Sequence, residues 1–138
     1  MTSRLREIVI DCRDPQLMAR FWGAVLDYGV VYQEEGEVEI GPYTADARPT
    51  RAAWRREVLP ATLLFVPVPE GKEIKNRLHL DVSPIDRTQE EEVERVLALG
   101  ARRIDIGQGN PSWVVLADPE DNEFCILNSM ALDAESGT

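Results

Sequence analysis

The sequence contains few histidines, cysteines and basic residues, and each shortage excludes a class of function. His79 is the single histidine among 138 residues, so a metal site with two histidines cannot be built within one chain. The two cysteines, Cys12 and Cys125, lie in apolar strand-like runs and form no spaced framework, which is typical of a reducing compartment. With 15 basic and 25 acidic residues the net charge is -10. This charge argues against a nucleic-acid partner, because phosphate binding needs a basic surface.

Long apolar segments are also missing. No run approaches the roughly 18 apolar residues that a membrane-spanning helix needs, so we expect no contact with a membrane. The amino terminus, MTSRLREIVI, enters a strand-like pattern without the apolar stretch of a signal peptide. Together with the cysteine pattern, this predicts a cytoplasmic protein. The apolar share of 43% is sufficient for a core, and the length predicts a single domain over residues 1–138.

The chain carries an internal repeat. Residues 8–12, IVIDC, have the apolar pattern of a strand, and a turn and a helix follow them. Residues 78–82, LHLDV, have the same pattern with Asp81 in the place of Asp11, and again a turn and a helix follow. The two halves of the chain are therefore expected to begin in the same way.

Both helices have clear start and stop signals. Asp14 can cap the first helix, and Pro15 suits its first position, where a missing N–H costs nothing. The second helix opens with a capping box, Thr88-Gln89-Glu90-Glu91, and ends at Gly100. We expect Tyr28-Gly29 to end the first helix in the same way. The apolar residues expected to face the core are Leu17, Met18, Phe21, Trp22, Val25 and Leu26 in the first helix and Val93, Val96 and Leu97 in the second.

Three strand-like runs separated by turn residues follow each helix. They are residues 29–33, 38–40 and 61–67 in the first half, and 102–106, 113–117 and 123–127 in the second. Each half therefore predicts the order β-α-β-β-β, with module 1 over about residues 5–68, module 2 over about 76–128 and a tail at 129–138. Neither half can bury its sheet alone, so we expect both to form one α+β domain. Residues 43–59 break the repeat and carry four arginines around Trp54.

Several segments resemble one known family. They are FWGAVLDYGV along the first helix, NRLHLDV at the start of the second half and WVVLADPEDNEFCIL at the end. With the paired βαβββ repeat, they are similar to the vicinal oxygen chelate (glyoxalase/bleomycin resistance/dioxygenase) superfamily, in particular to glyoxalase-like proteins of actinobacterial type. The resemblance covers residues 5–128. It implies two tandem modules whose curved mixed sheets enclose a cavity, with helices on the convex faces, and a homodimer.

Under this resemblance, strand alternation assigns each side chain to the cavity or to the helices. Trp113 could stack on a planar ligand there or pack against its neighbours. The side chains expected to face the cavity are Glu7, Val9, Asp11, Arg77, His79, Asp81, Glu123, Cys125 and Leu127. Those expected to pack against the helices are Ile8, Ile10, Cys12, Leu78, Leu80, Val82, Phe124 and Ile126.

The resemblance also implies where relatives hold a divalent metal. The two histidine positions fall on Glu7 and Arg77, the closing glutamate position falls on Cys125, and the remaining position, near Phe65 or Val66, is apolar. An arginine repels a divalent ion, so we expect no metal at these positions and no cofactor. The alternative is a shifted divalent-metal site with His79, Glu123 and Glu7 as ligands.

Three functions follow from these residues. The first is a protein that binds a small organic molecule without a metal. The second is a metal-dependent lyase, isomerase or dioxygenase with the shifted site around His79. The third is an enzyme without a metal in which His79 transfers a proton and Asp81 or Glu123 orients it. We take His79 and Glu123 as the candidate catalytic residues and regard the first function as the leading hypothesis.

Three further residues each allow more than one interpretation. Arg77 and Glu123 could form a structural ion pair across adjacent strands. Cys125 is expected to be a small buried apolar residue, although a nearby cation such as Arg77 could activate its thiol. Trp54 could belong to a lid, a dimer contact or a solvated loop.

Overall fold

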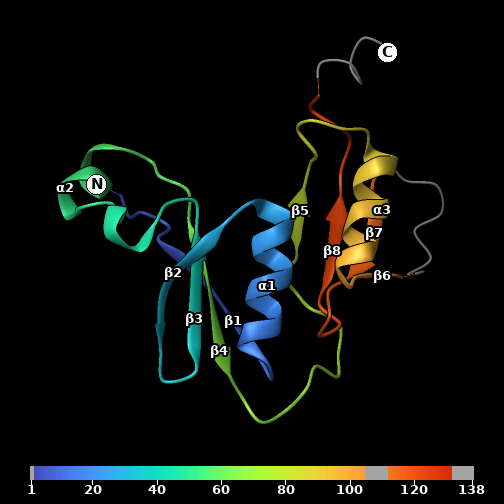
Figure 1. Cartoon of the computed structure of the whole chain (residues 1–138), viewed down its shortest axis with the longest axis horizontal. Coiled ribbons are helices and arrows are strands. Elements are labelled where there is room, and N and C mark those ends of the chain that lie inside the picture. Colours follow the sequence, from blue (N-terminus) through green and yellow to red (C-terminus); the bar gives the residue numbers. More distant parts are fainter. Residues whose placement is uncertain (1, 105–111, 132–138) are drawn as a thin grey trace. The chain divides into compact units, whose positions relative to one another are not determined.

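Two four-stranded sheets with the same strand order form the structure (Figure 1). The computed structural model describes residues 2–104 and 112–131, and these residues pack into two units, Met1–Gly71 and Lys72–Thr138. The boundary between the units lies in the polar segment between the two expected modules. The prediction that the two sheets enclose a shared cavity stays a prediction.

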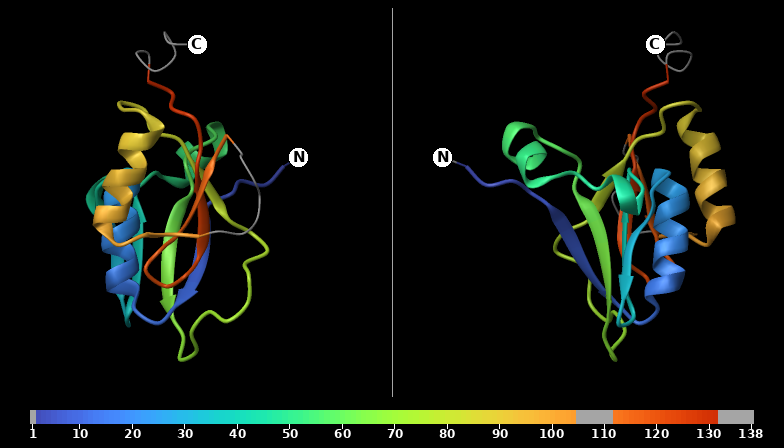
Figure 2. Two further views of the ribbon diagram at one scale, coloured as in Figure 1. Left: turned by 90° about the vertical axis from the view of Figure 1, so that its right-hand side faces the viewer. Right: turned by 60° about the vertical axis from the view of Figure 1, so that its left-hand side comes forward.

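The first unit contains one sheet with the order β1-β4-β3-β2. β1 and β4 are parallel, and the other neighbours are antiparallel. The helix α1 packs against β3 and β4 (Figure 2). The elements are β1 (Glu7–Cys12), α1 (Pro15–Leu26), β2 (Gly29–Glu34), β3 (Glu37–Gly41) and β4 (Thr62–Pro67), with a short 3-10 helix η1 (Ala45–Ala47) and the helix α2 (Arg51–Arg56) between β3 and β4.

The second unit repeats this arrangement with the order β5-β8-β7-β6. β5 and β8 are parallel, while β8, β7 and β6 are antiparallel neighbours. The elements are β5 (Leu80–Val82), α3 (Gln89–Leu99), β6 (Arg102–Arg103), β7 (Val114–Ala117) and β8 (Glu123–Ile126). The tandem βαβββ architecture of an α+β protein is therefore confirmed. Residues 105 and 106 of the predicted strand 102–106, and residues 132–138 of the predicted tail, lie outside the described residues.

The helix signals are confirmed at three of the four ends. Asp14 accepts a hydrogen bond from the Leu17 backbone N–H at 3.1 Å, and the capping box of Thr88 and Glu91 is formed on both sides. Gly100 ends α3 with a φ of 124°. The prediction that Gly29 ends α1 is wrong, because Asp27 adopts the left-handed conformation with a φ of 57° and Gly29 already begins β2. A short polar aspartate tolerates this conformation better than most residues do.

The helix-facing sides of both sheets form the cores. Phe65 on β4 and Phe124 on β8 are both 0% exposed. The predicted alternation along β1 is present, since its odd-numbered residues are exposed and its even-numbered residues are partly or fully buried. Leu78 is a correction: its side chain is 88% exposed, because β5 begins only at Leu80 and the residues before it do not follow the strand.

The inserted segment between β3 and β4 is partly folded onto the first unit. Trp54 on α2 is 8% exposed, and the guanidinium of Arg6 lies 5.4 Å from the centre of its ring. Arg4 donates hydrogen bonds to backbone carbonyls at the end of α2, including that of Trp54 at 3.0 Å and that of Glu57 at 3.1 Å. The interpretation of Trp54 as part of a solvated loop is therefore wrong. None of the described helices is long and apolar enough to cross a membrane.

Candidate functional site

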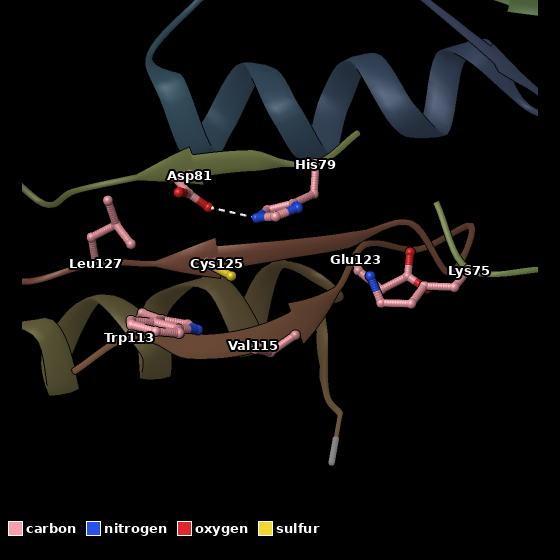
Figure 3. Close-up of a pocket in the computed structure, with 8 residues that line it drawn as sticks. All are labelled: Lys75, His79, Asp81, Trp113, Val115, Glu123, Cys125 and Leu127. Atoms are coloured by element: carbon pink, nitrogen blue, oxygen red, sulfur yellow. Dashed lines mark ion pairs between the residues drawn. The ribbon is translucent and has the colours of Figure 1, made fainter. Parts of the chain in front are cut away.

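A pocket of about 250 Å³ opens on the second unit, on the face of the sheet that the helix α3 does not cover (Figure 3). The strands β5, β7 and β8, with the residues next to them, supply most of its side chains. Apolar and charged groups both contribute to the lining. The lining residues are Lys75, His79, Asp81, Trp113, Val115, Glu123, Cys125 and Leu127.

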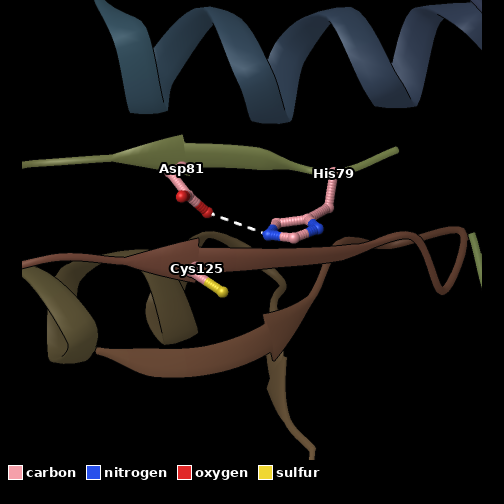
Figure 4. Close-up of side chains that lie close together, drawn as sticks. All are labelled: His79, Asp81 and Cys125. Carbon is pink, nitrogen blue, oxygen red and sulfur yellow. Dashed lines mark ion pairs between the residues drawn. The ribbon is translucent and has the colours of Figure 1, made fainter. Parts of the chain in front are cut away.

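Three side chains meet at the centre of the pocket (Figure 4). Asp81 on β5 and Cys125 on β8 are direct neighbours across the parallel strand pair. His79 lies just before β5, and its Nε2 lies 3.1 Å from Oδ1 of Asp81. One ligand atom from each of the three lies within 4.8 Å of the other two. Nδ1 of His79 points away from Asp81 (Figure 4).

The thiol of Cys125 is held in its protonated form. Burial raises its pKa, the negative charge of Asp81 and a hydrogen bond with that carboxylate raise it further, and Lys75 lowers it slightly, so that the pKa is about 11. The side chain is 5% exposed. These properties agree with the interpretation of Cys125 as a small buried residue, since a reactive thiol needs a lowered pKa.

Glu123 does not join the central group. Lys72 Nζ lies 3.0 Å from its Oε1, and the Asn76 backbone N–H donates to its Oε2 at 3.2 Å. Burial alone would raise the pKa of this carboxyl, but these hydrogen bonds, one from its own backbone and the Lys72 charge lower it overall. The expected ion pair between Arg77 and Glu123 is therefore wrong, because Lys72 takes that place.

The structure brings together only part of the predicted set of site residues. His79, Asp81, Trp113, Glu123, Cys125 and Leu127 line one pocket. Arg77 is exposed and does not line it. Glu7, Val9 and Asp11 lie on β1 of the first unit, all exposed. The ligands expected for the shifted metal site fall in both units, with Glu7 in the first and His79 and Glu123 in the second, so this site stays a prediction.

Two lining residues were missed. Val115 lies on β7 two residues after Trp113, so the alternation of the predicted strand 113–117 could have identified it. Lys75 precedes β5 in a segment without regular structure, and no periodic pattern in the sequence indicates where its side chain lies.

A second, much smaller pocket of about 30 Å³ lies in the first unit. Glu39 on β3 is 5% exposed and accepts a hydrogen bond from the Thr62 hydroxyl at 2.7 Å. Nη2 of Arg48, in the inserted segment, lies 3.4 Å from the same carboxylate. The inserted segment contributes Tyr43, Arg48, Pro49 and Trp54 to the lining of this pocket. The pocket has room for about one water molecule.

The two tandem βαβββ units have the architecture of the glyoxalase fold. The chain belongs to the family of the glyoxalase-like domain, whose model matches residues 7–127. A comparison with curated proteins found no match.

Solved structures show the same fold at low sequence identity. A glyoxalase/bleomycin resistance protein/dioxygenase family enzyme from Burkholderia phytofirmans is 20% identical, with a TM-score of 0.60 over 90% of this chain and 97% of that chain. The fosfomycin resistance protein FosX from Mesorhizobium loti is 16% identical, with a TM-score of 0.62 over 100% of both chains. A FosX variant from Listeria monocytogenes, in complex with Mn(II) and 1S,2S-dihydroxypropylphosphonic acid, is 15% identical. Its TM-score is 0.60 over 97% of this chain and 95% of that chain.

The residues present do not match a site for a hard ion such as Mn(II). Such ions prefer oxygen donors, and the positions implied by the resemblance hold Glu7, an arginine, an apolar residue and a thiol. The central group of His79, Asp81 and Cys125 offers a different set of one nitrogen, one oxygen and one sulfur atom. This mixed set suits a borderline ion such as Zn²⁺, which takes all three kinds of donor.

Proposed function

We propose that this protein binds a small organic molecule in the pocket of the second unit. The observation that carries the proposal is the composition of the pocket, which combines apolar surface with a few polar and charged groups. Trp113, Val115 and Leu127 supply the apolar surface, and the pair of His79 and Asp81 supplies the polar groups. Small-molecule sites generally combine apolar walls with a few polar groups that orient the ligand.

The roles of the central residues follow from their contacts. Asp81 holds the imidazole of His79 at 3.1 Å and leaves Nδ1 directed away from the carboxylate (Figure 4). An imidazole oriented in this way can accept a hydrogen bond or donate one, and it can also transfer a proton to or from a ligand. Trp113 is 42% exposed and offers an aromatic surface to a flat ligand.

A thermal-shift screen of a chemically diverse library of small organic molecules tests this proposal. We expect at least one compound to raise the melting temperature of the metal-free protein, because a ligand that binds only the folded state stabilises it. The shift should be lost in Trp113→Ala or His79→Ala and kept in Arg77→Ala, whose side chain is exposed outside the pocket. A library without any stabilising compound, or shifts unaffected by the two pocket variants, would overturn the proposal.

A metal-dependent activity is the second candidate, and the central group favours it. His79, Asp81 and Cys125 could hold a divalent ion, which would polarise oxygen atoms of a bound substrate. Metal analysis of the protein after dialysis against Zn²⁺ or Mn²⁺ tests this candidate. One equivalent of zinc that is lost in both His79→Ala and Cys125→Ser would support it. Metal below a tenth of an equivalent, or an amount equal in both variants, would contradict it.

A further inference from the structure

We infer that the ligand of this pocket is a small organic anion with a flat apolar portion, bound by Lys75 at one end and by Trp113 at the other. The inference rests on the proposed function and adds the chemical class of the ligand. It depends on three observations: the arrangement of the two ends, the pairing of the charged groups, and the tether that holds the segment before β5.

The two ends of the pocket differ in chemistry (Figure 3). Trp113 and Leu127 lie at one end, and Lys75 lies at the other end beside Glu123. His79 and the residues around it lie between them. A ligand that fills the pocket therefore contacts an aromatic surface at one end and an ammonium group at the other.

The carboxylates of the pocket already have partners, whereas no described residue forms an ion pair with Lys75. Glu123 is bound by Lys72 at 3.0 Å and by the backbone of Asn76, and Asp81 is bound by His79 at 3.1 Å. Among the described residues, no carboxylate lies within ion-pair distance, 4.0 Å, of the Lys75 ammonium. An anionic ligand would supply the missing partner, whereas a cationic ligand at this end would meet a like charge.

The overall charge of -10 does not oppose this preference. Solvent ions screen exposed charges over about 8 Å at physiological salt, so most of the acidic surface acts weakly inside the pocket. A group in contact with Lys75 lies beside that ammonium and near Glu123, whose charge is paired with that of Lys72. The acidic surface would slow the approach of an anion more than it would weaken the bound state.

The segment that carries Lys75 is held in place by its neighbour. The Asn76 backbone N–H donates to Glu123 at 3.2 Å, and the Asn76 side-chain amide donates to Oδ1 of Asn122 at 2.9 Å. Lys72 adds a second contact to Glu123. Because the backbone beside Lys75 is anchored to the start of β8, less conformational entropy is lost when its side chain binds a ligand.

Three naphthalene derivatives of nearly equal shape test the inference: 2-naphthoate, 2-naphthalenemethanol and 2-naphthylmethylammonium. Isothermal titration calorimetry at low salt measures the affinity of each one. We expect the carboxylate to bind about twofold to fivefold more tightly than the alcohol, as is usual for an exposed ion pair, and the ammonium to bind most weakly. The advantage of the carboxylate should decrease as salt is added.

Two neighbouring cations provide matched variants. Lys75→Gln should abolish the difference between carboxylate and alcohol, whereas Arg77→Gln should preserve it, because Arg77 is exposed outside the pocket. Trp113→Leu should weaken all three compounds together. Both lysine and arginine variants should melt at the wild-type temperature, because neither side chain is buried.

Several results would overturn the inference without affecting the proposed function. These are equal binding of the three compounds, a preference for the ammonium, and a carboxylate preference that survives in Lys75→Gln. Absence of binding by all three would also overturn it. The proposed function would then still depend on the separate screen of diverse compounds, so the two failures are distinguishable.

Discussion

The two sheets share one topology but carry different side chains on their open faces. Asp11 in β1 pairs with Val66 in β4, and Asp81 in β5 pairs with Cys125 in β8 at the equivalent place. Two residues earlier, β1 has Val9 where the second unit has His79. The first sheet therefore keeps the aspartate and lacks the histidine and thiol. The two sheets therefore offer equivalent positions, and the side chains at these positions determine the chemistry of each sheet.

A second difference concerns the side chains beside β4 and β8. Glu39 pairs with Leu64 in the first sheet, and Ala117 pairs with Glu123 at the equivalent place in the second. A methyl group fills far less space than a glutamate, and the inserted residues 43–59 have no counterpart in the second unit. The pocket beside Glu39 measures about 30 Å³, and the pocket that Glu123 lines measures about 250 Å³.

The largest expected effect comes from the equivalent core phenylalanines, which test how alike the two cores are. Phe65→Ala and Phe124→Ala should each lower the free energy of unfolding by about 3–5 kcal/mol, because each removes a side chain that is 0% exposed and leaves a cavity. Urea denaturation measures both. A cost below about 1 kcal/mol for one variant, beside a full cost for the other, would show that the two cores are not energetically equivalent.

A smaller effect is expected at Glu39, a buried carboxylate on β3 whose equivalent in the second sheet is Ala117. Thr62→Val should cost about 1–3 kcal/mol, because it removes a hydroxyl that donates to the buried Glu39 carboxylate at 2.7 Å. The same substitution should cost less in a Glu39→Gln background, since a neutral amide is cheaper to leave unpaired. Denaturation of the four proteins of this double-mutant cycle measures the coupling. Equal costs in both backgrounds would contradict the assigned contact.

The smallest expected effect concerns Glu123, a partly buried carboxylate in the second unit. Glu123→Gln should cost about 1 kcal/mol at neutral pH, since it removes the ion pair with Lys72. The pKa of Glu123 is lowered on folding, so the ion pair stabilises the protein above the ordinary pKa of 4.5 and is lost as pH falls through the lowered value.

The difference between wild type and Glu123→Gln should therefore shrink when urea denaturation is repeated below about pH 4. Lys72→Gln provides the control and should show the same pH dependence. A difference that stays constant between pH 7 and pH 3 would show that the ion pair is not its source.

Local patterns in the sequence were sufficient to predict the architecture and the orientation of many side chains. The strand period placed His79, Asp81 and Cys125 on one face, and cap residues such as Asp14 and Thr88 marked the helix starts. These features depend on residues close together in the chain. The pattern failed at Leu78, where the strand had not yet begun.

Partners that are distant in the chain could not be predicted in this way. Glu123 pairs with Lys72 rather than with Arg77, although both cations precede β5. Trp54 is buried because the amino-terminal residues Arg4 and Arg6 lie against α2, about fifty positions away from it in the sequence. Neither contact leaves a periodic signal in the sequence.

The repeat, the βαβββ order and the composition of each strand face follow from the amino-acid sequence, because they depend on alternation and capping within a few residues. Which groups form the site was decided by tertiary structure. Strand pairing brought Asp81 beside Cys125, the tether of Asn76 placed Lys75 at the pocket, and the Lys72 contact withdrew Glu123 from the centre. These contacts join segments that are far apart in the chain, so no pattern among neighbouring residues predicts them.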